Sequence, residues 1–302
     1  NHGTLTLSCM GGYVDGQLVG TAPDAQYYLF VTEDVTQESP VEESYWVEAA
    51  EEADRLGVDI ISTSLGYYEF DNPNYGHSYD EFTGDTAFAS KGANIAYSKG
   101  IVVVASAGNS GGSSEPINHV GVPAEATNVL AVGAVKFDES YATFSSVGPT
   151  FDGRIKPDVM AKGQAAVVAN TSGNIQTASG TSFSCPNLAG LATCLWQGFP
   201  EFNNIKIVDA LKRSANRYTN PNDRIGYGIP DMKNAFAYLL AEYATVSATI
   251  SNCKVDLSWR TKDVAGMQFW IERKLPSENT FQKIGQLNAT SVNVLTNKNY
   301  TY

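Results

Sequence analysis

The sequence lacks several features that would place it in a specialised class of protein. Its 302 residues contain no uninterrupted apolar run of about 18 residues, which argues against a transmembrane helix. Clusters of basic residues are missing too: 20 lysines and arginines stand against 32 acids, a formal net charge of −12. Because nucleic acids and anionic membranes are bound through basic patches, this balance argues against both as partners.

Cysteine and histidine are scarce as well. Four cysteines are too few for a disulfide scaffold, and with three histidines they show neither a Cys-x-x-Cys pair nor another zinc spacing. No metal ligands are therefore predicted from these residue types. What remains is a chain with an ordinary hydrophobic content of 43%, long enough for one large domain and a smaller one.

The core of the chain alternates between strand-like and helix-like segments. Residues 26–31, 59–64 and 101–105 are typical of strands, whereas 41–56 and 91–99 are typical of helices. In 41–56 the acids are expected on the face opposite the apolar stripe. The alternation predicts an α/β fold, a parallel sheet with helices on both faces, in which ligands bind beyond the carboxyl ends of the strands.

Three short motifs stand out for their chemistry. Gly-Thr-Ser-Phe-Ser-Cys-Pro at 180–186 places Ser182 on the first turn of an apolar helix, among unpaired N–H groups and at the positive end of the helix dipole. His2 opens a His-Gly-Thr triplet. The apolar run at 102–111 breaks into small residues around Asn109, whose amide could donate to a developing oxyanion. Taken singly, these residues predict only a helix cap, a structural histidine and a turn.

In this order the three motifs resemble those of the subtilisin-like serine peptidases, the subtilases of peptidase family S8. The resemblance covers residues 1–242 and implies a serine endopeptidase. In it His2 is the base, Ser182 the nucleophile that forms an acyl-enzyme, and Asn109 an oxyanion donor. Further segments agree with the family pattern, namely residues 64–66, 121–124, 129–135, 144–149, 156–161 and 226–231.

The resemblance also implies where a protein or peptide substrate binds. The end of the strand at 59–64 pairs with the substrate backbone, and the first specificity pocket lies beside it. The expected substrate-binding residues are Ser64, Leu65, Gly66, Ala107, Gly108 and Gly121. Since these residues are uncharged and mostly small, we expect bulky apolar or aromatic side chains before the scissile bond. The chemistry requires no cofactor.

One part of the family pattern has no counterpart here. Subtilases carry a catalytic Asp upstream of the histidine, and that carboxylate fixes the tautomer of the imidazole. The sequence begins one residue before His2, and Asp15 and Asp24 follow it. Three explanations stay open. The Asp lies on a segment absent from this sequence, the chain is a cleavage product that still holds an N-terminal fragment carrying the Asp, or the protein is a pseudo-enzyme.

Two other functions stay open as well. A peptidyl transferase would pass the acyl group to an amine, and an inactive subtilase-fold module would bind extended peptides without cutting them. The resemblance further implies a secreted or cell-surface protein of bacterial origin. It makes a bridge between Cys9 and Cys185 conceivable, because these lie on the helices that carry His2 and Ser182. The alternative is that both are buried free thiols.

A polar, tyrosine-rich insertion at 67–86 directly follows the substrate strand. It is expected either to overhang the cleft or to form a solvated surface loop. His77 and His119 are expected at the surface. Four acids of the insertion could hold a structural Ca²⁺, although they lack the spacing of an EF-hand. These acids are Asp71, Asp80, Glu81 and Asp85.

The pattern changes after residue 242 to short β-type runs separated by polar turns. We therefore expect a domain at 1–242 and a small all-β sandwich at 243–302 that resembles a fibronectin type III module. This segment is shorter than a complete sandwich of about 100 residues. Trp259 is expected in its core.

Overall fold

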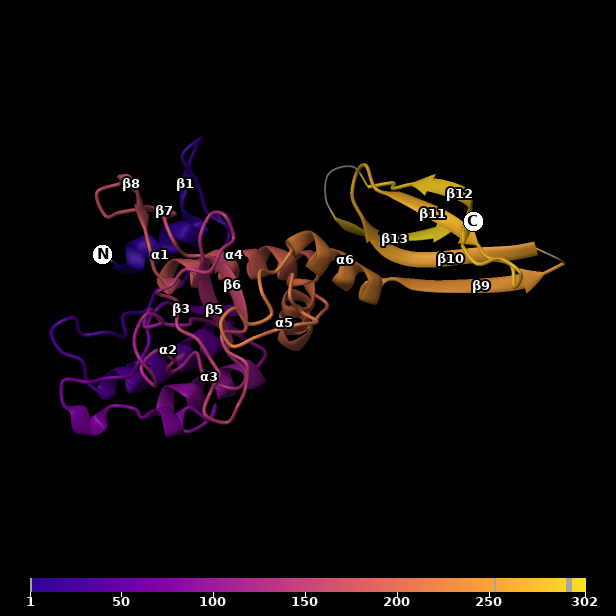
Figure 1. Ribbon diagram of the computed structural model, residues 1–302. Helices are drawn as coiled ribbons and strands as arrows, with labels where there is room; N and C mark the ends of the chain where they lie inside the picture. The colour runs from indigo at the N-terminus through magenta and orange to yellow at the C-terminus, as the bar shows by residue number, and fades with distance from the viewer. Residues whose placement is uncertain (1, 253, 292–294) are drawn as a thin grey trace. The chain divides into compact units, whose positions relative to one another are not determined.

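The computed structural model describes residues 2–252, 254–291 and 295–302, and the chain forms two compact units (Figure 1). The first unit ends at Ala235, and the second covers Phe236–Tyr302. Helix α6 (Met232–Tyr243) leads from one to the other. None of the described helices combines the length with the apolar character that crossing a bilayer requires.

The first unit is built on a four-stranded parallel sheet, as predicted. Its strands are β3 (Ile60–Thr63), β4 (Val102–Ser106), β5 (Leu130–Val135) and β6 (Val159–Lys162), paired in that order. Every residue of β4 and β5 is buried, which is why these strands are continuous apolar runs rather than alternating patterns. Strand β3 lies at one end of the sheet and is only partly covered.

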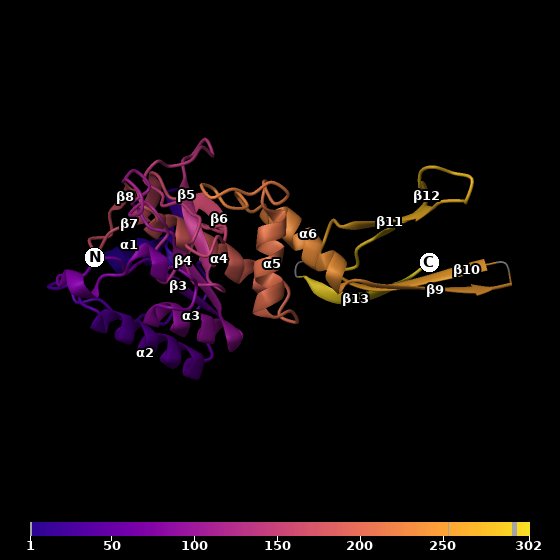
Figure 2. The same ribbon diagram turned by 60° about the horizontal axis from the view of Figure 1, so that its bottom comes forward.

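Helices cover both faces of this sheet, also as predicted (Figures 1 and 2). On one face the alanines of α3 (Phe88–Ser98) share a hydrophobic core with Val103 and Ala105 of β4, and α2 (Val41–Leu56) packs beside α3. Helix α4 (Thr181–Gly198) contacts all four strands from the other face. The helices predicted at 41–56 and 91–99 correspond to α2 and α3.

Two predictions for residues 26–56 are wrong. Residues 26–31 are not a strand, because no described strand pairs with them. In α2, Glu42 and Glu43 are buried instead of facing solvent. The carboxylate of Glu42 accepts hydrogen bonds from the backbone N–H groups of Asp34 at 2.8 Å and Ser39 at 3.1 Å. Such bonds offset the cost of removing a charge from water.

Smaller elements complete the first unit. Helix α1 (His2–Gly11) packs against α4. Two antiparallel hairpins and one further helix flank the main layers. They are β1 (Tyr13–Val14) with β2 (Leu18–Val19), β7 (Ala166–Ala169) with β8 (Ile175–Ala178), and α5 (Asn204–Ser214).

The insertion at 67–86 is packed against the body of the unit, so it is not a solvated loop. Tyr67, Phe70 and Phe82 are at most 6% exposed and belong to the same core as α3 and β4. Their rings explain why a segment that reads as polar folds inward. It contains two short 3-10 turns, η1 (Pro73–Tyr75) and η2 (Tyr79–Glu81).

The two histidines expected at the surface are held by neighbouring side chains. His77 bonds through Nε2 to Glu43 at 2.7 Å and through Nδ1 to Glu81 at 3.2 Å. His119 is 7% exposed, and its ring stacks on Tyr79 with the centres 4.2 Å apart. The surface prediction is wrong because Glu43 and Tyr79, which hold the two rings, come from distant parts of the sequence.

The second unit consists of antiparallel strands in two sheets. One sheet has the order β13-β10-β9, and the other pairs β11 with β12. The strands are β9 (Thr245–Ser251), β10 (Lys254–Asp263), β11 (Gln268–Arg273), β12 (Gln282–Asn288) and β13 (Thr296–Thr301).

Three aromatic rings connect the two sheets of this unit. The ring of Trp259 in β10 lies 5.3 Å from that of Tyr300 in β13 and 5.8 Å from that of Phe269 in β11. Trp259 is therefore a packing residue, as predicted. The resemblance of the unit to a fibronectin type III module stays a prediction.

Candidate active site

The serine turn lies at the start of helix α4. Gly180 precedes the helix with a φ of +157°, a conformation that side-chain-bearing residues rarely adopt. Ser182 is the second residue of the helix and is half-buried. At this position its backbone N–H has no partner within the helix and lies at the positive end of the helix dipole. The turn can therefore stabilise negative charge that develops beside the hydroxyl.

Pro186, inside α4, changes the hydrogen bonding of the turn. A proline has no N–H, so the carbonyl of Ser182, four residues earlier, loses its usual helical donor. The hydroxyl of Ser64 donates to that carbonyl instead, at 2.9 Å. This hydrogen bond joins the serine turn to the segment that follows β3. Pro186 makes it possible by leaving the Ser182 carbonyl without a helical donor.

Asn109 follows β4 and is oriented by the serine turn. Its Oδ1 accepts hydrogen bonds from the backbone N–H of Thr181 at 2.8 Å and from the Thr181 hydroxyl at 3.1 Å. Since a backbone N–H can only donate, the amide oxygen faces Thr181 and Nδ2 is left to donate elsewhere. The Thr181 hydroxyl in turn accepts from the N–H of Gly108 at 3.2 Å. The asparagine loop and the serine turn therefore hold each other in place.

One pocket of about 340 Å³ brings the predicted residues together. Its wall is formed in part by the segments at the ends of β3 and β4 and by the start of α4. The predicted residues that line it are Ser64, Leu65, Gly66, Ala107, Gly108, Asn109, Gly121 and Ser182. The pocket thus lies beyond the carboxyl ends of parallel strands, where open α/β sheets bind their ligands.

His2 begins α1 and is not among the residues that line this pocket. Its ring lies 6.0 Å from that of Phe183, the residue after Ser182. Packing there removes part of the imidazole from water and lowers its pKa, although the residue keeps an exposed edge. Within the described part of the chain, the imidazole of His2 has neither a hydrogen bond nor an ion pair. No carboxylate there fixes its tautomer.

Cys9 and Cys185 are free, buried thiols rather than a disulfide. Burial raises the pKa of Cys9 to about 12 and that of Cys185 to about 11. Thiols with such values are not ionised at neutral pH, so these residues act as small packing groups behind the serine turn. Cys253 lies outside the described residues.

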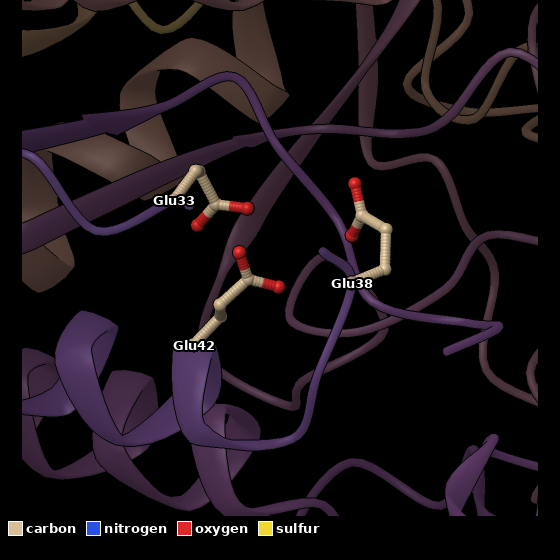
Figure 3. A group of neighbouring side chains, drawn as sticks. All are labelled: Glu33, Glu38 and Glu42. Carbon is tan, nitrogen blue, oxygen red and sulfur yellow. The ribbon is translucent and has the colours of Figure 1, made fainter. Parts of the chain in front are cut away.

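A group of three acids lies near the start of α2 (Figure 3). Glu33, Glu38 and Glu42 each offer a carboxylate oxygen, all within 4.8 Å of one another. Burial, together with the neighbouring negative charges, raises the pKa of both Glu33 and Glu38. Both oxygens of Glu42 already accept backbone hydrogen bonds, and we assign no metal to this group.

The acids predicted to hold calcium are engaged differently. Glu81 bonds to His77 and accepts from the backbone N–H of Ser78 at 3.1 Å. Asp71 accepts from the backbone N–H of Glu38 at 3.2 Å. A structural Ca²⁺ at Asp71, Asp80, Glu81 and Asp85 stays a prediction.

Comparison with known proteins places the chain in a family. The family model of the subtilases, Peptidase S8, matches residues 1–228. Subtilisin DY of Bacillus licheniformis is 33% identical over 211 residues, which are 70% of this chain and 67% of the relative. Subtilisin of Bacillus pumilus is 31% identical over 238 residues, 78% of this chain and 77% of the relative. The chain belongs to the subtilase family of serine peptidases.

Other relatives are matched over less of their length. The chain spans about half of subtilisin NAT of Bacillus subtilis subsp. natto, to which it is 33% identical over 218 residues, 71% of this chain. Among solved structures, the self-cleaved protease domain of PatA is similar with a TM-score of 0.65 at 24% identity. That match covers 79% of this chain and 83% of the other, and it supports the fold alone.

Several pocket residues were not singled out from the sequence. Tyr67 and Tyr68 come from the insertion, and Ile117 and His119 come from the loop before Gly121. One indication of His119 existed in the sequence, because this residue lies two positions before Gly121, which was expected to bind substrate. The tyrosines had none, since a polar, aromatic insertion does not reveal which of its rings turn inward.

Proposed function

We propose that this chain is a serine endopeptidase that hydrolyses peptide bonds through an acyl-enzyme on Ser182. The observation that carries the proposal is the shared pocket. It holds a serine at a helix N-terminus, an amide donor that is oriented by Thr181, and an extended segment that can pair with a peptide. A serine that only caps a helix would require neither the amide donor nor the extended segment.

In the proposed mechanism Ser182 Oγ attacks the substrate carbonyl while His2 takes its proton. The carbonyl oxygen becomes an oxyanion, which the Ser182 N–H and Asn109 Nδ2 stabilise. His2 then protonates the leaving amine, and water attacks the acyl-enzyme by the reverse route. The lowered pKa of His2 keeps the imidazole neutral near pH 7, the form that can accept a proton.

Substrate would bind in an extended form along Ser64, Leu65 and Gly66. These residues follow β3, and such a segment can pair with a peptide through backbone hydrogen bonds. The side chain before the scissile bond would enter the pocket. Its walls carry no Asp, Glu, Lys or Arg and include Leu65 and Ile117, so a bulky apolar or aromatic side chain is expected there.

We infer further that the orienting carboxylate comes from a segment outside the described chain. Among the described strands, β3 is paired on one side only, so its other edge can accept another strand. Residues 28–31 expose an apolar run in which Leu29 is 72% and Val31 94% accessible. Both features fit a sheet that takes up a further strand, such as an N-terminal fragment that carries an Asp.

A second candidate is a peptide-binding module that does not cut. It is favoured by one observation, the lack of a described hydrogen bond or ion pair on His2, since an unoriented imidazole is a poor base. A peptidyl transferase would use the same pocket and differ only in the acceptor. For either enzyme, secretion or attachment to a bacterial surface is part of the proposal, as in the resemblance stated above.

A mixed peptide library, read by mass spectrometry, separates these functions. The protein is incubated with the library alone, with an added amine, and with a synthetic strand that carries the Asp. A Ser182→Ala variant serves as the control. Hydrolysis lost in that variant supports the peptidase, and products carrying the amine support the transferase. Binding without turnover, even with the strand supplied, would contradict both.

A further inference from the structure

The sheet formed by β11 and β12 carries a large aromatic ring on its outer face (Figure 1). Phe269 and Ile271 point inward, since Phe269 contacts the ring of Trp259 and Ile271 is only 6% exposed. Because side chains alternate along a strand, Trp270 between them projects from the opposite face, and it is 61% exposed. The other three tryptophans of the chain are buried or partly buried, so this ring is an exception.

An ammonium group and several amides surround this ring. Lys283 Nζ lies 4.3 Å from the centre of the Trp270 ring and donates to Gln286 Oε1 at 2.6 Å. Gln286 is the cross-strand partner of Trp270, so the three side chains share the outer face. The next outward pair is Gln268 and Asn288, whose amides are bonded to each other at 3.2 Å. Hydrogen-bond donors and acceptors therefore border a flat apolar surface.

A second ring with its own ammonium group lies further along the same sheet. Counting alternate residues from Trp270 leads to Glu272 and then to Lys274, about 13 Å away at roughly 3.3 Å per residue. Lys274 Nζ lies 6.0 Å from the centre of the Phe281 ring, which is 64% exposed. Both residues directly adjoin the last cross-strand pair of the sheet. The sheet thus offers two exposed rings, each with a lysine beside it.

The charge of the second unit indicates what kind of ligand fits this face. Residues 236–302 contain seven lysines and arginines and five acids, a net charge of +2, whereas the whole chain carries −12. The C–H groups of a sugar ring are slightly positive and suit the negative face of an indole, and amides can bond its hydroxyls. An ammonium group beside the ring can pair with a carboxylate. Together these groups are complementary to a polysaccharide that carries carboxylates.

Other anionic partners match the face less well. Glu272 lies between the two rings, where it would repel a nucleic acid, because a phosphate backbone carries a charge at every nucleotide. In a lipid bilayer the Glu272 carboxylate and the amides beside Trp270 would lose water without gaining partners. The hydroxyls of a sugar can instead donate to that carboxylate.

We propose that the outer face of the β11–β12 sheet binds an acidic polysaccharide, with a sugar ring stacked on Trp270 and its carboxylate paired with Lys283. Phe281 and Lys274 contact a later sugar of the same polymer. The site belongs to the second unit alone and does not depend on the chemistry proposed for Ser182. Its role is to hold the protein at a surface that carries acidic glycans.

Binding of the full chain to polygalacturonate, measured by isothermal titration near physiological salt, tests the site. The fully methyl-esterified polymer keeps the sugar rings and lacks the charges. We expect polygalacturonate to bind about 10-fold more tightly than the ester, the effect of one charged hydrogen bond. Lys283→Gln should remove most of this difference. Trp270→Ala should weaken the binding of both polymers about 10-fold, because the stacked ring is lost.

A matched control is available in the first unit. Phe137→Ala removes another exposed ring that has a lysine ammonium 5.3 Å from its centre, and it should change neither affinity. If Trp270→Ala does not fold, Trp270→Phe keeps a smaller ring and should bind both polymers with intermediate affinity. Reaction of Ser182 with a fluorophosphonate should be the same in every variant.

The contradicting results are equally specific. The proposal is overturned if polygalacturonate does not bind, if Trp270→Ala leaves its affinity unchanged, or if the ester binds equally well. Tighter binding of poly(dT), or of phosphatidylglycerol vesicles, than of polygalacturonate would overturn it as well. None of these results bears on the peptidase, which the reaction of Ser182 reports separately.

Discussion

The amide of Asn109 illustrates how single residues acquire a role from their neighbours. An exposed asparagine after a strand is ordinarily a turn former, and the sequence offers no more than that. Here Thr181 donates both hydrogen bonds that the amide oxygen accepts, at 2.8 and 3.1 Å. The nitrogen is thereby directed away from Thr181 before any substrate arrives. Preorganised donors of this kind cost no reorganisation during reaction.

Replacing Asn109 with Ala should lower kcat with little change in KM. The donor acts on charge that exists only in the transition state, and in subtilisin the loss of such a side chain costs about 10²–10³ in kcat. The measurement is steady-state kinetics on a cleaved peptide. Asn74→Ala, at an exposed position of the insertion, is the matched control. An equal effect on kcat and KM, or none, would argue that Asn109 only shapes the loop.

The pH dependence of Ser182 labelling should report His2. As a base the imidazole must be neutral, so reactivity falls as pH drops through its pKa. Desolvation lowers that pKa, so the acid limb should have its midpoint below 6.5, the ordinary value. A carboxylate partner would shift it upward. His119→Gln should leave the midpoint unchanged, and a midpoint above 6.5 without such a partner would contradict the assignment.

Between elements, one link from the segment after β3 to α4 is the hydrogen bond from the Ser64 hydroxyl to the Ser182 carbonyl. Ser64→Ala would leave the Ser182 carbonyl without its donor and should lower the free energy of unfolding by about 1–2 kcal/mol. Pro186→Ala in that background supplies a backbone N–H four residues on, and part of the loss should be recovered. Denaturant unfolding of the two single variants and the double variant measures the coupling. Additive effects would mean that the bond does not depend on Pro186.

The insertion is fastened to α2 by His77, and this attachment should depend on pH. Although burial opposes it, the bonds to Glu43 and Glu81 raise the pKa of His77 above its ordinary value. A raised pKa in the folded state means that the stabilisation is complete below the unfolded value and is lost as pH rises through the folded one. The melting temperature lost in His77→Gln should therefore be largest at acid pH. A loss that grows toward alkaline pH would contradict this.

Elements with strong patterns were predictable from the sequence, and those defined by distant partners were not. Strands β4 and β5 are apolar throughout because they are buried on both faces, and α2 and α3 have helical periodicity. Residues 26–31 have the same composition as a strand but no neighbour to pair with. Glu42 is buried because backbone N–H groups of the preceding loop donate to its carboxylate, and His77 is held by Glu43, which lies 34 residues away.

For the whole molecule, motif order indicated most of the pocket wall, whereas the part that the insertion adds was not indicated. Ser182, Asn109 and Gly121 are spread over the first unit, and their common pocket follows from strand ends that meet at one edge of a parallel sheet. No pattern in residues 67–86 indicates that Tyr79 backs a histidine of that pocket. The fold could therefore be predicted from the sequence to a greater extent than the full set of residues that line the pocket.

The central claim is that Ser182 is a nucleophile, and the most direct measurement is mass spectrometry after treatment with a fluorophosphonate. We expect one adduct on the peptide that contains Ser182. The adduct should be absent from Ser182→Ala and present in Ser110→Ala, a change in the same pocket. A protein that stays unlabelled even with an Asp-bearing strand added, or an adduct that survives Ser182→Ala, would contradict the account.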